Sequence, residues 1–375
     1  MDEKRKQIKL NKKSLLIAVA VIAIIVVIAI VVGLLPAKPT GERIVLGVNT
    51  GDENFGSTLK GCPVPIGNLI GVVTGGNFIV VDDKGDVKTT ENFVLTDPIL
   101  HSKGNFTVAA DFKGNTAKLY EKGDVKTTVT TEGKIISVVT NANGFFAVAS
   151  KETGYDAVIT VYRKNGEAIY RYRITDHTFI DMDISANNRK LVVVEANLKG
   201  GTVGSNVVLV EFNREDSESV FYAKGNVYVA VHFNKNGSFV CLGNEKTDLY
   251  RADGSKMGEI LYNDRNLIAS DITTDDMICL GFEAGPDDNA GSSNMEIYDK
   301  TGKMRGEISF DDTLEHISVN GNYAAVSHGD VVDIVKGDGK IKITFESTAP
   351  VKYGVPFESG KAVVVFSGGN TVILK

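Results

Sequence analysis

The sequence predicts an all-β protein, a β-propeller of eight four-stranded blades, and two observations lead to this prediction. The first is a short apolar segment that recurs at a period of roughly 40–50 residues, which is typical of propellers. The second is a polar hairpin with a central glycine that follows most copies of this segment. Seven blades is the alternative, if one of the units consists of two fragments.

The recurring apolar segments are predicted to be the second strand of each blade. A strand of nearly continuous Val, Ile, Leu, Phe and Ala must be covered on both faces, as the inner strands of stacked sheets are. The copies are LIGVV at Leu69, FTVAAD at Phe106, FFAVAS at Phe145, KLVVVEA at Lys190, SFVCLG at Ser238, MICLGF at Met277, YAAVSH at Tyr323 and KAVVVFS at Lys361. Only neighbouring blades can cover these faces, so the ring must close.

The polar hairpins are predicted to join the third and fourth strands. They carry KGD, NGE, DGS, TGK and DGK, in which Gly or Asn supplies the positive φ that tight hairpins need. One copy, DKTGKMRGEISF at residues 299–310, looks like a phosphate loop but lacks the G-x-x-x-x-G-K-[ST] spacing and a following helix. We therefore interpret it as the outer hairpin of the sixth blade.

The two ends of the predicted propeller, residues 42–375, indicate how the ring closes. The last repeat, from Tyr353, supplies only three strands. The segment ERIVLGV at residues 42–48 has the composition of a strand but no repeat of its own. It is predicted to be the missing outer strand of the last blade.

Ahead of the propeller the sequence predicts a basic tail (1–14), a transmembrane helix (15–35) and a short linker (36–41). The apolar segment Leu15–Leu35 has no charge and no Pro, and as a helix it would be about 31 Å long, enough to cross a bilayer. The basic tail predicts a cytoplasmic N-terminus and an extracytoplasmic propeller anchored in the cell membrane. The alternative is a signal peptide cleaved after Ala37, although the apolar run is longer than such peptides have.

The charge of the chain argues against a nucleic-acid partner. The chain has 41 basic and 47 acidic residues, a net charge of −6. The tail holds six of the basic and two of the acidic residues, which leaves 35 basic and 45 acidic residues, or −10, for the remainder. Binding to nucleic acid needs a basic surface, and this part of the chain is acidic.

The sequence predicts no cofactor. Cys62, Cys241 and Cys279 are too few and too scattered for a disulfide framework or a zinc site, so we interpret them as buried thiols. The five histidines show no metal-binding spacing. Calcium is the one candidate metal, because two segments are rich in carboxylates: DDKGD at Asp82, and PDDNAGSSN, which contains Asp287 and Asp288. Neither segment fits the EF-hand pattern, and solvated acidic turns are the simpler interpretation.

The hairpin D-x-T-G-K at Asp299–Lys303 resembles the D-x-x-T-G-x-x-x-W docking motif of quinoprotein-like propellers. The chain contains no Trp, so neither that family's Trp packing nor a quinone cofactor is implied, and the Trp-Asp pair of WD-repeat propellers is also absent. With its basic tail, single apolar span and Gly/Asn-punctuated repeats, the chain is similar to single-pass, extracytoplasmic propeller-like proteins of unknown function from Gram-positive bacteria. This resemblance implies a fold and a compartment but no activity.

One face of the propeller is predicted to be the ligand face, because it carries the loops between second and third strands. Three of these loops are expected to be long: KETGYD at Lys151, ANLKGGTVGSN at Ala196 and EAGPDDNAGSSN at Glu283. Long loops on a rigid scaffold often carry function, although surfaces also tolerate insertions that have none. Tyr155 in the first loop is a candidate stacking surface.

The linkers between blades lie on the same predicted face, and several carry an acid just before a first strand. These acids are Asp97, Asp176, Asp264 and Asp312. Converging carboxylates would attract a metal, an amine or a basic peptide, whereas Asx-turns at the linkers are the simpler interpretation. His177, next to Asp176, completes the one acid–histidine pair near the predicted channel entrance.

The function that the sequence favours is binding, as a membrane-anchored scaffold or recognition module for a cell-envelope protein, peptide or glycan. The anchor raises the local concentration of the propeller, which suits weak contacts. The alternative is an extracytoplasmic enzyme, a hydrolase or lyase with a site at the central channel. That alternative requires converging carboxylates and a His with shifted pKa values.

Overall fold

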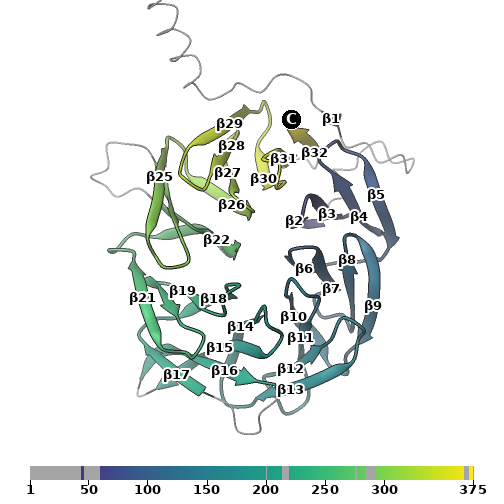
Figure 1. Ribbon diagram of the computed structural model, residues 1–375, viewed down its shortest axis with the longest axis vertical. Helices are drawn as coiled ribbons and strands as arrows, with labels where there is room; N and C mark the ends of the chain where they lie inside the picture. The colour runs from purple at the N-terminus through teal and green to yellow at the C-terminus, as the bar shows by residue number, and fades with distance from the viewer. Residues whose placement is uncertain are drawn as a thin grey trace, which may run out of the picture. The chain divides into compact units, whose positions relative to one another are not determined.

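The computed structural model describes residues 44–45, 60–199, 201–212, 219–274, 277–283, 292–366 and 371–374. These residues form eight four-stranded sheets arranged as the blades of a ring (Figure 1), which confirms the eight-bladed propeller and not the seven-bladed alternative. The predicted tail, span and linker lie outside the described residues. No helix within the described part of the chain has the length and apolar character needed to cross a membrane.

Each blade is an antiparallel sheet whose strands follow the chain from the centre of the ring to its rim, with one exception in the last blade (Figure 1). Blades 1 to 4 consist of β2 (Lys60–Ile66), β3 (Leu69–Val73), β4 (Asn77–Asp82), β5 (Val87–Asn92); β6 (Pro98–Lys103), β7 (Phe106–Asp111), β8 (Thr116–Glu121), β9 (Asp124–Thr130); β10 (Lys134–Thr140), β11 (Phe146–Lys151), β12 (Ala157–Tyr162), β13 (Ala168–Ile174); and β14 (Thr178–Ile184), β15 (Lys190–Lys199), β16 (Thr202–Glu211), β17 (Ser219–Lys224). Blades 5 to 8 consist of β18 (Tyr228–Phe233), β19 (Phe239–Gly243), β20 (Lys246–Tyr250), β21 (Lys256–Leu261); β22 (Leu267–Thr274), β23 (Met277–Glu283), β24 (Ser293–Tyr298), β25 (Met304–Phe310); β26 (Leu314–Asn320), β27 (Tyr323–His328), β28 (Val331–Lys336), β29 (Ile341–Glu346); and β30 (Val351–Pro356), β31 (Ala362–Phe366), β32 (Thr371–Leu374), β1 (Ile44–Val45).

The predicted second strands are all second strands of blades, from β3 in blade 1 to β31 in blade 8. Their side chains are buried on both faces because apolar clusters fill the space between adjacent blades. The first strands line the centre, where each contacts the first strand of the next blade and β30 contacts β2. The core is therefore a closed series of layers between blades.

The outer strand of blade 8 comes from the other end of the propeller, as predicted from the segment 42–48. β1 pairs antiparallel with β32, with Ile44 opposite Ile373 and Val45 opposite Val372. Ile373 is fully buried in a cluster that joins blade 8 to Ile70 and other apolar residues of blade 1. Strand pairing and apolar packing thus close the ring at the same place.

The glycines of the predicted hairpins have positive φ, as the hairpin sequences indicated. Their φ angles are Gly85 91°, Gly123 95°, Gly166 86°, Gly254 85°, Gly302 82° and Gly339 83°. In blades 2, 3, 5, 6 and 7 an added Cβ would come within van der Waals distance of an atom of the preceding blade. Each of these hairpins therefore sits directly on the blade before it, in a chain without the Trp that docks quinoprotein-like blades. The hairpin at residues 299–303 belongs to the sixth blade, as predicted.

Replacing Gly254 with alanine is expected to destabilise the propeller by about 2–5 kcal/mol. The new methyl group would overpack the contact with blade 4, and the positive φ at this position is strained for any residue other than glycine. An ideal Cβ at Gly254 would lie 2.1 Å from Cζ of Phe221 in blade 4. Gly154 is the matched control, because its φ is 86° and nothing lies within 4 Å of its Cβ position. Urea unfolding of both variants measures the difference, and equal losses of stability would contradict this account of the hairpin.

Candidate functional site

The four predicted linker acids lie at separate blade junctions and are all exposed. Asp97 precedes β6, Asp176 precedes β14, Asp264 precedes β22 and Asp312 precedes β26. Among the described residues, no hydrogen bond or ion pair joins one of these acids to another. They are distributed over one face of the ring and do not converge on a common ligand position.

Side chains from neighbouring strands hold the linkers in place. Asp111, at the end of β7, accepts hydrogen bonds from the amides of Thr96 and Asp97 at 2.8 and 2.6 Å. Ser293 accepts one from the amide of Leu314 and donates one to the carbonyl of Asp312. The linkers are thus capped by residues near the second-to-third strand loops, and the four acids remain available to solvent.

Asp176 and His177 engage different partners and do not form an acid–histidine pair. Asp176 accepts a hydrogen bond from Thr175 at 3.1 Å, while Nδ1 of His177 lies 3.1 Å from the buried carboxylate of Glu195. The Tyr155 ring lies 5.7 Å from the guanidinium of Arg173, within its own blade. The remaining candidates, Asp287 and Asp288, lie outside the described residues.

One of the three predicted long loops is instead part of a hairpin. Residues 196–206 continue β15 and β16 as paired strands, with Leu198 opposite Val203 and Lys199 opposite Thr202. The prediction was wrong because the polar and glycine-rich composition of this segment hid a period-2 pattern that continues up to the turn at Gly201. The loop that follows Lys151 consists of residues 152–156, between β11 and β12. Residues 284–291 of the third loop lie outside the described residues.

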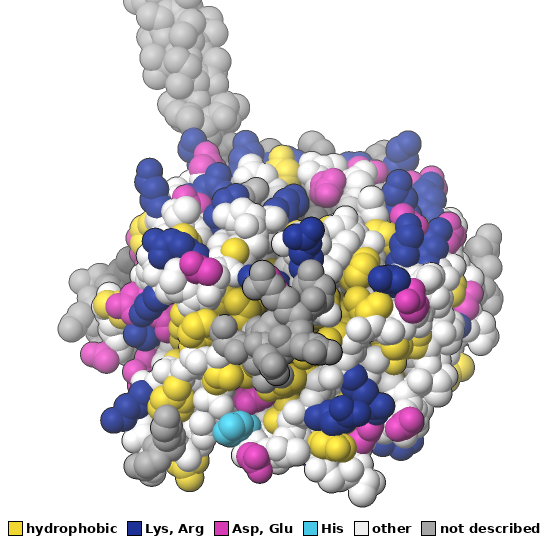
Figure 2. Space-filling model, turned by 60° about the horizontal axis from the view of Figure 1, so that its bottom comes forward, with side chains coloured by type: hydrophobic (Ala, Val, Ile, Leu, Met, Phe, Trp, Pro, Cys, Tyr) yellow, Lys and Arg dark blue, Asp and Glu magenta, His cyan; other side chains and the backbone are white. Residues whose placement is uncertain are grey.

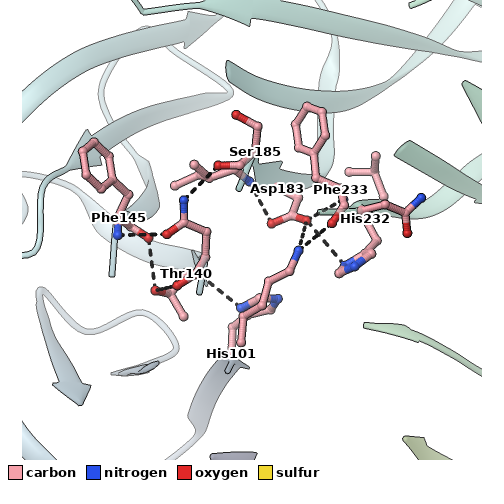
Figure 3. Close-up of polar contacts among 12 residues, drawn as sticks. His101, Thr140, Phe145, Asp183, Ser185, His232 and Phe233 are labelled. Carbon is pink, nitrogen blue, oxygen red and sulfur yellow. Dashed lines mark hydrogen bonds and ion pairs between the residues drawn. The ribbon is translucent and has the colours of Figure 1, made fainter. Parts of the chain in front are cut away.

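A buried polar layer crosses the centre of the ring, and the sequence did not predict it (Figure 3). Nζ of Lys103, in blade 2, lies 3.3 Å from Oδ2 of Asp183 in blade 4 and donates a hydrogen bond of 2.7 Å to the carbonyl of Phe233 in blade 5. The amide of Phe233 donates to the same carboxylate at 2.7 Å, and Nδ1 of His232 lies 3.5 Å from it. Three blades are therefore joined through one carboxylate.

The ion pair keeps Asp183 ionised although only 1% of this residue is exposed. Burial alone would raise the pKa of Asp183, but Lys103, His232 and the Phe233 amide outweigh burial and hold the pKa below its ordinary value. A buried carboxylate with a lysine and an amide at hydrogen-bonding distance is satisfied, so this layer is a structural brace across the channel.

The same bonding pattern recurs around the channel. The amide of Val231 donates to Asp181 at 2.9 Å and the amide of Val319 to Asp271 at 2.7 Å, in each case across a blade junction. The amide of Thr140 donates likewise to Nδ1 of His101 at 3.1 Å. The channel edge of a first strand has no neighbouring strand, so its amides need acceptors from side chains. Polar residues of the adjacent first strand supply them.

The channel opens into a cavity on each side of this polar layer. On the side of the first-to-second strand turns, a hollow of about 650 Å³ is lined by turns from most of the blades, including Gly67, Gly104, Asn322 and Glu358. On the other side, a chamber of about 330 Å³ is lined by β2, β6, β10 and Asp181. We call these the turn-face hollow and the linker-face chamber. The larger cavity lies on the face opposite to the one that the sequence favoured.

Three groups of the linker-face chamber have shifted pKa values, and burial is the main cause in each. Burial raises the pKa of Asp181 to about 7, lowers that of His101 to about 4 and raises that of Cys62 to about 12. His101 is neutral because its Nδ1 lone pair accepts the Thr140 amide hydrogen. All three cysteines are free; Cys241 and Cys279 are buried thiols, as predicted, whereas Cys62 is only partly buried.

Replacing Asp181 with Asn is expected to change the pH dependence of folding stability. Since the pKa rises from 3.8 to about 7 on folding, the native protein retains a proton that the unfolded chain releases. The stabilising contribution of this carboxyl is complete below about pH 4 and is lost as the pH rises through 7. The Asp181→Asn variant should therefore gain stability relative to the wild type between about pH 4 and 7.5. Urea unfolding at several pH values tests this, and a constant difference would contradict it.

The sequence of residues 64–375 matches the Family of unknown function (DUF5711). The chain belongs to this family. No curated protein matches the chain in sequence. The family match covers blades 2–7 completely, blade 1 from Val64 onward, and blade 8 without its outer strand β1.

Solved structures show that the fold of this DUF5711 chain is shared with propellers of other families. The C-terminal WD40 domain of Sif2 has a TM-score of 0.59 at 11% identity, covering 85% of this chain and 97% of that one. Chaetomium thermophilum Sqt1, bound to the N-terminus of ribosomal protein L10, has 0.57 at 10% identity, covering 89% and 100%. BamB from Moraxella catarrhalis has 0.51 at 12% identity, covering 84% and 96%. Identities this low establish the fold alone.

The sequence contained one overlooked signal for the channel of this DUF5711 protein. Asp181 and Asp183 stand two residues apart in TFIDMDI, the first strand of blade 4, and so share a face of an otherwise apolar strand. A β-bulge between Phe179 and Asp181 precedes them. Lys103 offered no such signal, because it lies 80 residues from its partner Asp183.

Proposed function

We propose that this protein is a membrane-anchored, extracytoplasmic propeller that binds a cell-envelope protein, peptide or glycan and acts as a scaffold. The apolar segment at residues 15–35 and the basic residues before it support the anchor and its orientation. The propeller supports the binding role, because propellers present loops and turns from many blades on a rigid ring.

The turn-face hollow is the observation that carries this proposal. It is open, of about 650 Å³, and polar groups line it together with small residues such as Gly67, Gly104 and Ala142. Buried Asn side chains fix the turns around it, since Nδ2 of Asn320 donates to the carbonyls of Gly67 and Pro356 at 2.9 and 3.1 Å. A preformed surface of this kind lowers the ordering cost of binding a partner.

Two further observations support a polypeptide or glycan partner. A solved propeller with this fold, Sqt1, is bound to the N-terminus of a ribosomal protein. On the face shown in Figure 2, basic side chains stand beside acidic ones and form no continuous basic field. That mixture suits protein or glycan surfaces better than a phosphate backbone.

The alternative, a hydrolase or lyase, depends on the linker-face chamber, where a carboxyl and an imidazole with shifted pKa values do occur. Both groups already accept amide hydrogens, and no hydrogen bond among the described residues joins Asp181 to His101. The nearby thiol of Cys62 has a pKa raised to about 12 by burial, so it is not a thiolate. This arrangement favours binding over nucleophilic catalysis.

Site-specific photocrosslinking in intact cells tests the binding role. A photoreactive residue at exposed Glu358 or Asn322, on the turn-face hollow, is expected to crosslink one discrete envelope component. Asp97 and Asp264, exposed on the opposite face, are the matched control positions. Crosslinks from the control positions alone would overturn the assignment to the turn face. Protease protection of the propeller in cells stripped to the cytoplasmic membrane would overturn its extracytoplasmic placement.

A further inference from the structure

The linker-face chamber has the size and lining of a site for a small organic ligand. Its volume of about 330 Å³ falls at the lower end of the range for ligand pockets, roughly 300–1,000 Å³. Apolar side chains form most of its wall: Val64, Pro98, Ile99, Leu100, Ile136 and Val138. The polar lining groups are few and come from four blades. Such a lining selects a ligand with an apolar body and one polar group.

Asp181 is the carboxyl group of this chamber, and it has no counter-ion among the described residues. Its side chain accepts hydrogen bonds from the amides of Val231 and Met182. Asp183, two residues further along the same strand, differs in having Lys103 at 3.3 Å. The chamber therefore contains one acid with neutral donors only, whereas the polar layer beside it is balanced in charge.

The other polar groups of the chamber wall do not supply the missing positive charge. His101 is neutral, because its Nδ1 accepts the Thr140 amide hydrogen, and its proton is on Nε2. Cys62 is a thiol whose Sγ lies 3.5 Å from Nε2 of His316. A cation that enters the chamber would meet no positively charged lining residue.

Exposed carboxylates surround the chamber, although Lys352 is also close enough to Cys62 to lower the pKa of its thiol in part. Asp97 is exposed and directly precedes Pro98 and Ile99 of the chamber wall. The linkers at Asp176, Asp264 and Asp312 place three more exposed carboxylates on the same face of the ring. Carboxylates spread around an opening raise the local concentration of cations even when none contacts the ligand.

We propose that the linker-face chamber binds a primary ammonium group carried on a small apolar body, with Asp181 as its counter-ion. The ammonium would pair with the Asp181 carboxylate, and the body would pack on Ile99, Ile136 and Val138. The same group can come from a free amine or from a lysine side chain of a polypeptide. This site is separate from the turn-face hollow, so the two assignments can fail independently.

The test is a titration of the full-length protein in detergent, followed by NMR of isoleucine methyl groups. The probes are benzylammonium, the uncharged isostere benzyl alcohol, and a short peptide with one internal lysine. Ile99 and Ile136 report on the chamber, while Ile343, in the outer strand of blade 7, reports on a distant site. A pH near 8 keeps Asp181 ionised, since burial raises its pKa to about 7.

We expect benzylammonium to shift the Ile99 and Ile136 signals saturably, and to bind at least about tenfold more tightly than benzyl alcohol. Asp181→Asn should abolish that preference, while Asp124→Asn, which alters an exposed carboxylate in the outer strand of blade 2, should retain it. Binding of the lysine peptide would identify a polypeptide source, and binding of benzylammonium alone a free amine. Equal binding of the amine and the alcohol to the wild type would overturn the proposal without any variant, as would no shift at Ile99 and Ile136.

Discussion

Replacing Asp183 with alanine is expected to destabilise the propeller by about 3–5 kcal/mol. The substitution leaves Lys103, which is 8% exposed, without its carboxylate, and it removes the acceptor of the Phe233 amide. A buried charge and a buried donor are then both unsatisfied. Chemical denaturation of the wild type and the variant measures this loss.

A double substitution separates the net contribution of the ion pair to folding stability from the cost of leaving one of its charges unpaired. Replacing Lys103 with Met and Asp183 with Leu removes both charges, so the double variant should be more stable than Asp183→Ala. Asp97→Ala is the matched surface control, and its expected effect is within about 0.5 kcal/mol. If Asp183→Ala proved as mild as Asp97→Ala, the polar layer would not brace the channel.

Replacing Ile373 with Asp is expected to be more damaging still, with a loss of about 5 kcal/mol or more. Ile373 is fully buried, pairs with Ile44 of β1, and packs in the cluster that joins blade 8 to blade 1. An unpaired carboxylate at this position disrupts both the pairing of β1 with β32 and the apolar packing between blades 8 and 1. Such a loss approaches the whole stability of a typical domain.

Limited proteolysis combined with thermal unfolding tests whether Ile373 is needed for the closure of the ring between blades 8 and 1. The Ile373→Asp variant should be cleaved near blades 8 and 1 under conditions in which the wild type resists. Ile373→Val keeps the apolar contact and is expected to cost only about 0.5–1.5 kcal/mol. A variant with Asp at this position and native protease resistance would show that closure does not depend on β32.

The sequence was sufficient for most of the fold because the physical constraints on a propeller are local. A strand such as LIGVV, apolar throughout, has to be covered on both faces, and this alone located the second strand of every blade. The segment 42–48 was identified as the closing strand because the last repeat lacked one. Glycine hairpins such as the one at Gly254 were evident from the need for positive φ.

The candidate site was harder to predict because it depends on contacts between distant residues. Lys103 and Asp183 become partners only after the ring has closed, and nothing in either local sequence indicates the other. The exposed acids, such as Asp264, each precede the first strand of a different blade, and their separation follows from ring geometry. β-bulges like the one before Asp181, which re-aim first strands at the channel, have no clear sequence signal.

In blades 2, 3, 5, 6 and 7 the contact between the outer hairpin and the preceding blade has a consequence for the order of assembly. When blade 5 leaves the ribosome, the surface that its hairpin packs against, at Phe221 of blade 4, has already been synthesised. Blades can therefore be added one at a time in the direction in which the ribosome produces them. β1 is the exception, since its partner β32 is translated at the far end of the propeller. The first strand of the propeller to be synthesised is the last to be paired.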